Sequence, residues 1–125
     1  LPQYQHVVAE VKQFLLERAT VCEQAGMPRQ HIILDPGFGF GKSLNENHEL
    51  LQKLEHLHLL GAPLLVGVSR KSMITKKLNC SPDEALNGTS ILQTLAYTKG
   101  ARIFRVHDIK EVKELILLLA AQDLH

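Results

Sequence analysis

Three short blocks of this sequence place ionisable side chains at the ends of apolar runs. In parallel α/β folds, binding and catalytic side chains gather where a strand ends and a helix begins. If the three runs are such strands, the blocks bring one carboxylate, three cations and an imidazole to a shared rim. The blocks are residues 34–42 (LDPGFGFGK), 67–72 (GVSRKS) and 105–108 (RVHD).

The carboxylate of the first block is Asp35. It ends an apolar run and precedes Pro36, which favours an extended backbone at the residue before it. A carboxylate placed at such a rim can accept two parallel hydrogen bonds from a ligand with an amidine-like N–C–N edge. The alternative is that Asp35 caps a loop or a helix.

The cations of the other blocks indicate an anion site. Arg105 and His107 are two residues apart, so on a strand their side chains share a side. Two donors on one side suit a phosphate or a pyrophosphate. Arg70 and Lys71 are adjacent and point opposite ways, so we expect only one of them to reach this site. For His107 the alternative is a structural, hydrogen-bonded histidine.

Glycines alternate along the first block. Gly37, Gly39 and Gly41 are followed by Lys42, but the spacing matches neither of the two common phosphate-binding glycine motifs. We predict instead a loop that needs positive φ angles and close backbone approach. The two phenylalanines that alternate with the glycines would be available to cover an aromatic ligand; they are Phe38 and Phe40.

Hydrophobic periodicity predicts the elements that position these blocks. Ser43 with Glu46, and Ser81 with Glu84, have the spacing of helix capping boxes. The main helices are predicted over residues 4–25, 43–60, 81–100 and 108–122, with a short helical turn near 72–78. Continuous apolar runs predict strands buried on both faces, over residues 31–34, 64–68 and 102–106.

The alternation of these elements at a nearly constant interval predicts βαβ units, with parallel strands and right-handed crossovers. The fold class is therefore α/β. Three strands are few for such a fold, since a TIM barrel takes about 250 residues and a doubly wound sheet about five or six strands. The chain has 125 residues and starts Leu1-Pro2 without a methionine. We therefore expect it to be part of something longer.

Composition excludes several classes of protein. With 14 basic and 13 acidic residues, a net charge of +1 argues against a nucleic-acid-coating or polybasic membrane protein. No apolar run approaches the roughly 20 residues of a membrane span. The two cysteines, Cys22 and Cys80, have no metal-type spacing, and the histidines form no ligand-like set, so no protein-bound metal is expected. We expect a cytoplasmic protein that binds neither nucleic acid nor membranes.

The three blocks resemble the signature blocks of the C-terminal half of dihydropteroate synthase, and the resemblance covers essentially the whole chain. It implies a (β/α)8 TIM barrel, of which residues 1–125 would be the C-terminal part of a single pterin-binding domain. This part has three parallel strands and four main helices, and the N-terminal strands are absent. The implied reaction belongs to folate biosynthesis and to the enzyme family that sulfonamides target. It joins p-aminobenzoate to 6-hydroxymethyl-7,8-dihydropterin pyrophosphate and gives dihydropteroate and pyrophosphate.

The resemblance also implies roles for particular residues. Asp35 would bind the 2-amino-pyrimidinone edge of the pterin, and Lys71 would donate to its polar edge. Arg105 and His107 would hold the pyrophosphate, so Lys71, Arg105 and His107 are the predicted catalytic residues. Arg70 would anchor a loop. The remaining predicted substrate-binding residues would help to hold p-aminobenzoate; they are Gly39, Phe40 and Ser72.

Several expectations follow from the absent strands. Mg²⁺ would act through the substrate pyrophosphate, with its protein ligand in the absent N-terminal half. The full-length family member would be a homodimer, whereas these 125 residues alone would be inactive and prone to self-association. Two alternatives remain: another pterin-binding barrel of the methyltetrahydrofolate methyltransferase type, and a non-catalytic half-barrel module. The cations of the second and third blocks favour the synthase, because a pyrophosphate leaving group needs them.

Overall fold

The structure is a computed structural model, and it describes residues 3–122. The predicted domain therefore reaches five residues beyond the described part. The elements, in chain order, are α1 (Val7–Gln24), the 3-10 helix η1 (Arg29–His31), α2 (Leu44–Gln52), the 3-10 helix η2 (Leu54–Leu60), β1 (Leu64–Val66), α3 (Ser72–Leu78), the 3-10 helix η3 (Pro82–Glu84), α4 (Leu86–Thr98), β2 (Ala101–Phe104) and α5 (Ile109–Gln122).

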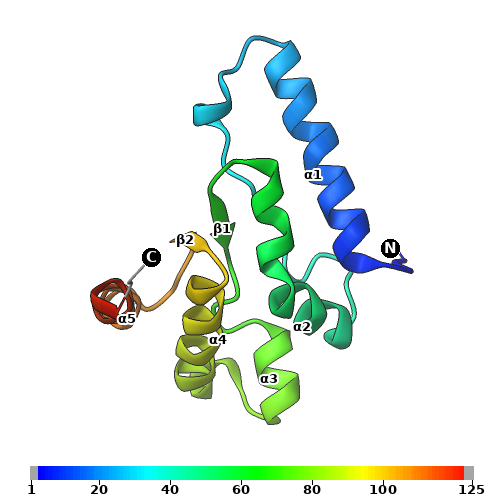
Figure 1. The fold of residues 1–125 in the computed structure, drawn as a ribbon. Coiled ribbons are helices and arrows are strands. Elements are labelled where there is room, and N and C mark those ends of the chain that lie inside the picture. The colour runs from blue at the N-terminus through cyan, green and yellow to red at the C-terminus, as the bar shows by residue number, and fades with distance from the viewer. Residues whose placement is uncertain (1–2, 123–125) are drawn as a thin grey trace.

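A small parallel sheet lies between two groups of helices (Figure 1). Strands β1 and β2 pair in parallel, with a bulge between Leu64 and Leu65. The long helix α1 lies on one side of the molecule, alongside α2 and η2, and α5 lies on the other side, packed on α4. The parallel α/β class predicted from the sequence is confirmed.

The predicted strand 31–34 is only partly formed. Leu34 makes a single parallel bridge to Leu64, with hydrogen bonds of 2.8 Å on either side of it. The 3-10 turn η1 occupies the residues before the bridge, and Pro36, which has no N–H to donate, follows soon after it. The prediction of three strands is therefore wrong, since the described residues form a sheet of two strands. The expected burial on both faces is also wrong here, since Ile33 is 53% exposed.

The helices follow the sequence pattern with two breaks. The predicted helix 43–60 divides at Lys53 into α2 and η2. Leu54 and Leu57 are both fully buried, and their spacing of three residues keeps them on one face of a 3-10 helix. Ser43 and Glu46 form the predicted capping box. Ser81 and Glu84 form the other, but it caps η3, and α4 starts only after it.

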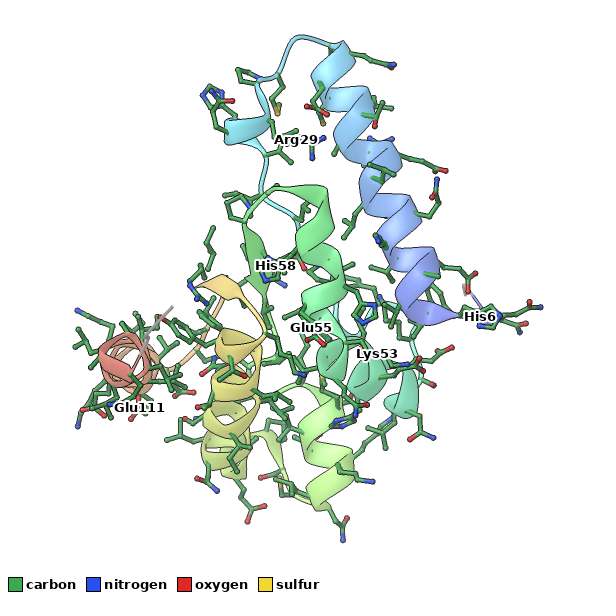
Figure 2. The ribbon with its side chains drawn as sticks, viewed as in Figure 1. His6, Arg29, Lys53, Glu55, His58 and Glu111 are labelled. Carbon is green, nitrogen blue, oxygen red and sulfur yellow. The ribbon has the colours of Figure 1, made fainter. Side chains whose placement is uncertain are left out.

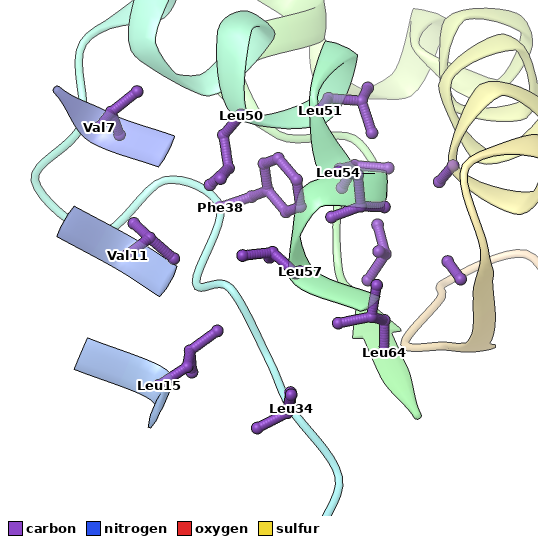
Figure 3. Close-up of a cluster of buried hydrophobic side chains, with 14 of the residues drawn as sticks. Val7, Val11, Leu15, Leu34, Phe38, Leu50, Leu51, Leu54, Leu57 and Leu64 are labelled. Atoms are coloured by element: carbon purple, nitrogen blue, oxygen red, sulfur yellow. The ribbon is translucent and has the colours of Figure 1, made fainter. Parts of the chain in front are cut away.

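One hydrophobic core joins α1, the first glycine loop and η2 (Figure 3). Phe38 is 1% exposed, so the loop that follows Leu34 is fastened to the core in its middle. The core side chains labelled in Figure 3 are Val7, Val11, Leu15, Leu34, Phe38, Leu50, Leu51, Leu54, Leu57 and Leu64. Phe38 is thus unavailable to cover a ligand, contrary to the expectation from its alternation with Phe40.

The end of α4 is tied to η2 by polar contacts. Lys99 forms an ion pair of 3.3 Å with Glu55, and a ring nitrogen of His58 lies 3.0 Å from the carbonyl oxygen of Lys99. Figure 2 labels Glu55 and His58 on η2. Within the described residues, no helix is both long and apolar enough to cross a membrane.

Candidate active site

The first junction is a glycine loop that holds Asp35 at its start. Gly37, Gly39 and Gly41 all have positive φ, between 75° and 99°, as predicted from the sequence. The Asp35 carboxylate accepts a hydrogen bond of 2.9 Å from the backbone N–H of Gly37. Because this bond fixes one carboxylate oxygen, the other oxygen, Oδ2, is held toward the neighbouring junctions.

A buried asparagine pins this loop to α2. Asn47 is 3% exposed, and its Oδ1 accepts a hydrogen bond of 2.8 Å from the N–H of Gly39. Its amide nitrogen donates to the carbonyl oxygen of Ser43 at 3.0 Å. Lys42 closes the loop from the other end with a bond of 2.6 Å to the carbonyl oxygen of Gly37. The backbone around Gly39 is therefore held in one position relative to the helix.

The two cations of the second junction separate as predicted from their adjacency. Arg70 has a positive φ of 54° and turns away from the rim toward Asp108. Its Nε and Nη2 donate to the two oxygens of that carboxylate, each at 3.0 Å. These bonds raise the pKa of Arg70 and lower the pKa of Asp108. Arg70 thus has the geometry of a loop anchor.

Lys71 turns instead toward the glycine loop. Its Nζ donates to the carbonyl oxygen of Phe38 at 2.7 Å and lies 5.3 Å from the centre of the Phe40 ring. Burial lowers the pKa of Lys71, and the nearby charge of Arg105 lowers it further. Phe40 is 69% exposed, so it borders the site from outside.

Arg105 and His107 meet Lys71 around one cavity of about 120 Å³. The expectation that both side chains share a side is therefore confirmed. The cavity is lined by Gly67, Ser69, Lys71, Arg105, Val106 and His107.

Gly67 has a specific reason to lack a side chain. A Cβ there would lie only 2.5 Å from Nη2 of Arg105, so the guanidinium occupies the space beside the glycine. A glycine at the end of β1 therefore lets the Arg105 side chain cross the rim, where its Nη1 reaches Asp35.

Asp35 is joined to this cavity through Arg105. Nη1 of Arg105 donates to Oδ2 of Asp35 at 3.2 Å, and the two side chains are 55% and 35% exposed. Asp35 itself borders a second cavity of about 350 Å³, which Phe40 and Lys42 also line. The ion pair thus lies between the cavity that Lys71 and His107 line and a neighbouring cavity that Phe40 and Lys42 line.

The remaining predicted site residues are less closely involved. The structure places Gly39 under Lys71, since a Cβ there would lie 3.7 Å from Cδ of Lys71. Ser72 begins α3, is exposed and does not line either cavity. The rim therefore brings together Asp35, Lys71, Arg105 and His107, with Gly39 and Phe40 beside them.

Sequence reasoning gave no role to Ser69 or to Asn47. Ser69 is 5% exposed and its Oγ lies 2.7 Å from Nδ1 of His107. It could have been found in the sequence, because it stands in the same block as Lys71. Asn47 is one polar residue on an amphipathic helix, and nothing in the sequence distinguishes it from an exposed one.

Comparison with known proteins identifies the family. Residues 1–107 match the family model of pterin binding enzymes. The chain belongs to the pterin binding enzyme family. The resemblance to dihydropteroate synthase found in the sequence is confirmed by relatives of that name. The dihydropteroate synthase of Escherichia coli (strain K12) is 47% identical over 120 residues, which cover 96% of this chain and 43% of that protein.

Solved structures of this pterin binding enzyme family have the same fold. A Yersinia pestis dihydropteroate synthase bound to a pterine-sulfa conjugate superposes with a TM-score of 0.94 at 39% identity, over 98% of this chain and 48% of that one. The Xanthomonas albilineans enzyme in complex with 7,8-dihydropteroate gives a TM-score of 0.92 at 40% identity, over 99% and 48%. The chain spans less than half the length of these proteins. Its partial α/β fold corresponds to part of their TIM barrels.

Proposed function

We propose that this chain is part of a dihydropteroate synthase. The reaction joins p-aminobenzoate to 6-hydroxymethyl-7,8-dihydropterin pyrophosphate. The observation that carries the proposal is the Asp35–Arg105 ion pair at the edge of a cavity that Lys71 and His107 also line. A carboxylate beside a cluster of cations matches a substrate with an N–C–N edge at one end and a pyrophosphate at the other.

Asp35 is the pterin-recognising group in this proposal. Its two oxygens accept hydrogen bonds from the guanidinium of Arg105 and from Gly37. The N–C–N edge of a pterin offers the same kind of paired donors as a guanidinium. An exposed ion pair contributes only about 0–1 kcal/mol, so a pterin can take the place of Arg105 at little cost.

Arg105 and His107 bind the leaving pyrophosphate. When the C–O bond between the pterin methylene and the pyrophosphate breaks, the electron pair stays on oxygen and the methylene becomes carbocation-like. The amine nitrogen of p-aminobenzoate then bonds to the methylene and loses a proton. Donors fixed beforehand around the departing oxygens stabilise the developing charge without reorganising. Lys71 donates to the polar edge of the pterin, beside the same cavity.

The other predicted residues lie where they can help to hold p-aminobenzoate. Phe40 lies next to Lys71 and is open to an aromatic ring, and Gly39 keeps the backbone close to Lys71. Ser72 follows Lys71 at the start of α3. It can contact p-aminobenzoate only if the bound ligand extends past Lys71. Correct orientation of the two substrates contributes the rest of the rate enhancement.

Mg²⁺ enters this proposal only as the companion of the pyrophosphate. Among residues 3–122, no group of three or more histidine, cysteine, aspartate or glutamate side chains is arranged to hold a metal ion. In this proposal Arg105 and His107 supply positive charge to the leaving group, and the protein ligand of Mg²⁺ belongs to the N-terminal half of the barrel. We also propose a homodimer in the cytoplasm, where free cysteines such as Cys22 and Cys80 stay reduced.

The experiment that tests the proposal is a pyrophosphate-release assay with both substrates. We expect turnover from the full-length protein that contains these residues, and none above background from residues 1–125 alone. Titration of the same proteins with pterin pyrophosphate, and with an analogue lacking the 2-amino group, separates binding from turnover. Equal affinity for the two pterins would contradict recognition by Asp35. Full activity from the 125 residues would contradict the proposal that this chain holds only part of the site.

A further inference from the structure

A buried serine next to the anion-binding cavity has no role in the function proposed above. Ser69 follows β1, is 5% exposed, and contacts His107, which lies beyond the end of the neighbouring strand β2. Its Oγ is 2.7 Å from Nδ1 of the imidazole and 3.3 Å from the backbone nitrogen of the same residue. The serine thus contacts His107 at both its ring and its backbone.

The hydrogens of these groups restrict how the contact can be made. A backbone N–H can only donate, so it uses one lone pair of the Ser69 oxygen. The hydroxyl hydrogen still needs an acceptor, and Nδ1 is the acceptor within reach. A neutral imidazole that accepts at Nδ1 carries its one hydrogen at Nε2. The other neutral tautomer would leave the buried hydroxyl hydrogen of Ser69 without a partner in the described part of the chain.

The same contact survives protonation of the imidazole. When both ring nitrogens carry hydrogens, the hydroxyl oxygen of Ser69 accepts from Nδ1, and the hydroxyl hydrogen loses its partner at the same cost as in the Nδ1–H tautomer. Nε2 therefore donates in both charge states. No hydrogen bond within the described residues uses Nε2, and the histidine lines the cavity together with Lys71 and Arg105.

We propose that Ser69 is a positioning residue that fixes Nε2 of His107 as a hydrogen-bond donor toward an anion in this cavity. Lys71 and Arg105 can only donate, whereas a histidine can present a lone pair that would repel an anion. Ser69 removes that possibility. The anion is the pyrophosphate of the proposed function, on which this part of the inference rests. The tautomer of His107 is independent of it.

The first experiment reads the tautomer directly. Two-bond ¹H–¹⁵N correlation spectra of histidine-labelled protein distinguish hydrogen at Nε2 from hydrogen at Nδ1, and His107→Gln assigns the resonances. We expect the Nε2–H form of His107 in the parent protein at a pH where the ring is neutral. In Ser69→Ala we expect a mixture of tautomers, and in Ser69→Cys, which keeps a weak donor, a partial return. Ser90→Ala, which removes a hydroxyl on α4, is the matched control.

The second experiment measures the consequence for an anion, with inorganic pyrophosphate as the probe. Loss of one oriented donor predicts that Ser69→Ala weakens pyrophosphate binding about three- to tenfold. The same substitution in a His107→Ala background should have no further effect, because Ser69 acts only through the imidazole. A structural role for Ser69 would weaken binding equally in both backgrounds and would leave the tautomer unchanged.

The outcomes separate the two proposals. An Nδ1–H tautomer in the parent protein, or an unchanged tautomer in Ser69→Ala, would overturn the role of Ser69. A tautomer that depends on Ser69 supports that role even if pyrophosphate does not bind. Absence of pyrophosphate binding in the parent protein would instead contradict the assignment of the anion, which belongs to the proposed function.

Discussion

Two arginine–carboxylate pairs join the strand-end junctions of this molecule, and they differ in how they are built. Arg70 binds Asp108 with two hydrogen bonds of 3.0 Å, and the side chains are 21% and 22% exposed. Arg105 binds Asp35 with one bond of 3.2 Å, and those side chains are 55% and 35% exposed. The same residue types at neighbouring junctions thus form a partly enclosed pair with two hydrogen bonds and an open pair with one.

The difference indicates which pair supports the loop and which recognises a ligand. Two parallel bonds in a partly enclosed setting hold the guanidinium in one geometry, which suits a loop whose backbone has a positive φ at Arg70. A single exposed bond contributes little to folding and exchanges readily with other partners. We infer that the Arg105–Asp35 pair opens for a pterin and that the Arg70–Asp108 pair stays closed.

The largest effect is expected at Asp35. Asp35→Ala removes both oxygens that would accept from the pterin, and we expect roughly 100-fold weaker binding of pterin pyrophosphate. The temperature of unfolding should fall less than in Arg70→Ala, because the ion pair it removes is the more exposed of the two and its other loss is the single hydrogen bond from Gly37. Calorimetric titration and thermal unfolding measure the two effects on one sample. A large fall in Tm with unchanged affinity would reverse the roles of the two pairs.

Breaking the other pair should lower stability instead. We expect Arg70→Ala to lower Tm by roughly a few degrees. The substitution removes both hydrogen bonds to Asp108, and these bonds hold the left-handed backbone at residue 70 in place. At a temperature where the variant stays folded, its pterin affinity should fall far less than that of Asp35→Ala. An affinity loss as large as at Asp35 would show that the pair is part of the binding site.

The pH dependence of this stability has a defined sign. The pKa of Asp108 is lower in the folded protein than its ordinary value because Arg70 binds the carboxylate. The pair therefore stabilises the protein above the ordinary pKa of an aspartate, and this contribution is lost as pH falls through the lowered pKa. The difference in Tm between the parent protein and Arg70→Ala should narrow in acid. A difference that widens would contradict the pairing.

A smaller change should disturb only the open pair. Gly67→Ala places a Cβ where the guanidinium of Arg105 now lies, and the flexible end of that side chain must move. We expect about three- to tenfold weaker pyrophosphate binding, equivalent to one hydrogen bond, with little change in Tm. Val68→Ala, at a buried neighbour, is the matched control and should lower Tm while affecting binding less.

The smallest effect is expected from Lys71→Arg. Burial, together with the charges of Arg105 and Lys42, lowers the pKa of Lys71, so its charge is lost at a lower pH than that of an ordinary lysine. Pyrophosphate binding should therefore weaken as pH rises through that pKa. An arginine stays charged, so Lys71→Arg should keep its affinity for pyrophosphate at alkaline pH. The loss of affinity there should be roughly threefold smaller than in the parent protein. Parallel pH profiles for the two proteins would contradict a contribution from Lys71.

Much of this rim could be predicted because its residues obey local rules. Alternation along an extended segment predicts that Arg70 and Lys71 diverge and that Arg105 and His107 share a side. These residues do so just beyond the ends of β1 and β2, and at Arg70 the left-handed backbone contributes to the divergence. The three glycines of the first loop predict positive φ angles, which the structure has. Each of these features depends only on residues close by in the sequence, so it can be predicted without the structure.

Other features depend on contacts between distant parts of the chain and could not be predicted. The buried position of Phe38 depends on space left by α1 and η2, and the role of Asn47 depends on where the glycine loop ends. The missing third strand depends on how few ladder bonds fit between η1 and Pro36. The partner of Asp35 was likewise unforeseen, because a carboxylate in a sequence does not reveal which of several arginines it will meet.

The most direct test follows the two arginine side chains while a ligand binds. The Nε–Hε resonances of Arg70 and Arg105, assigned with Arg70→Lys and Arg105→Lys, are recorded during titration with pterin pyrophosphate. We predict that the Arg105 resonance shifts as the guanidinium leaves Asp35 and that the Arg70 resonance stays in place. A bound pterin with the Arg105 resonance unmoved, or with the Arg70 resonance moved instead, would contradict the division between a recognising pair and a supporting pair.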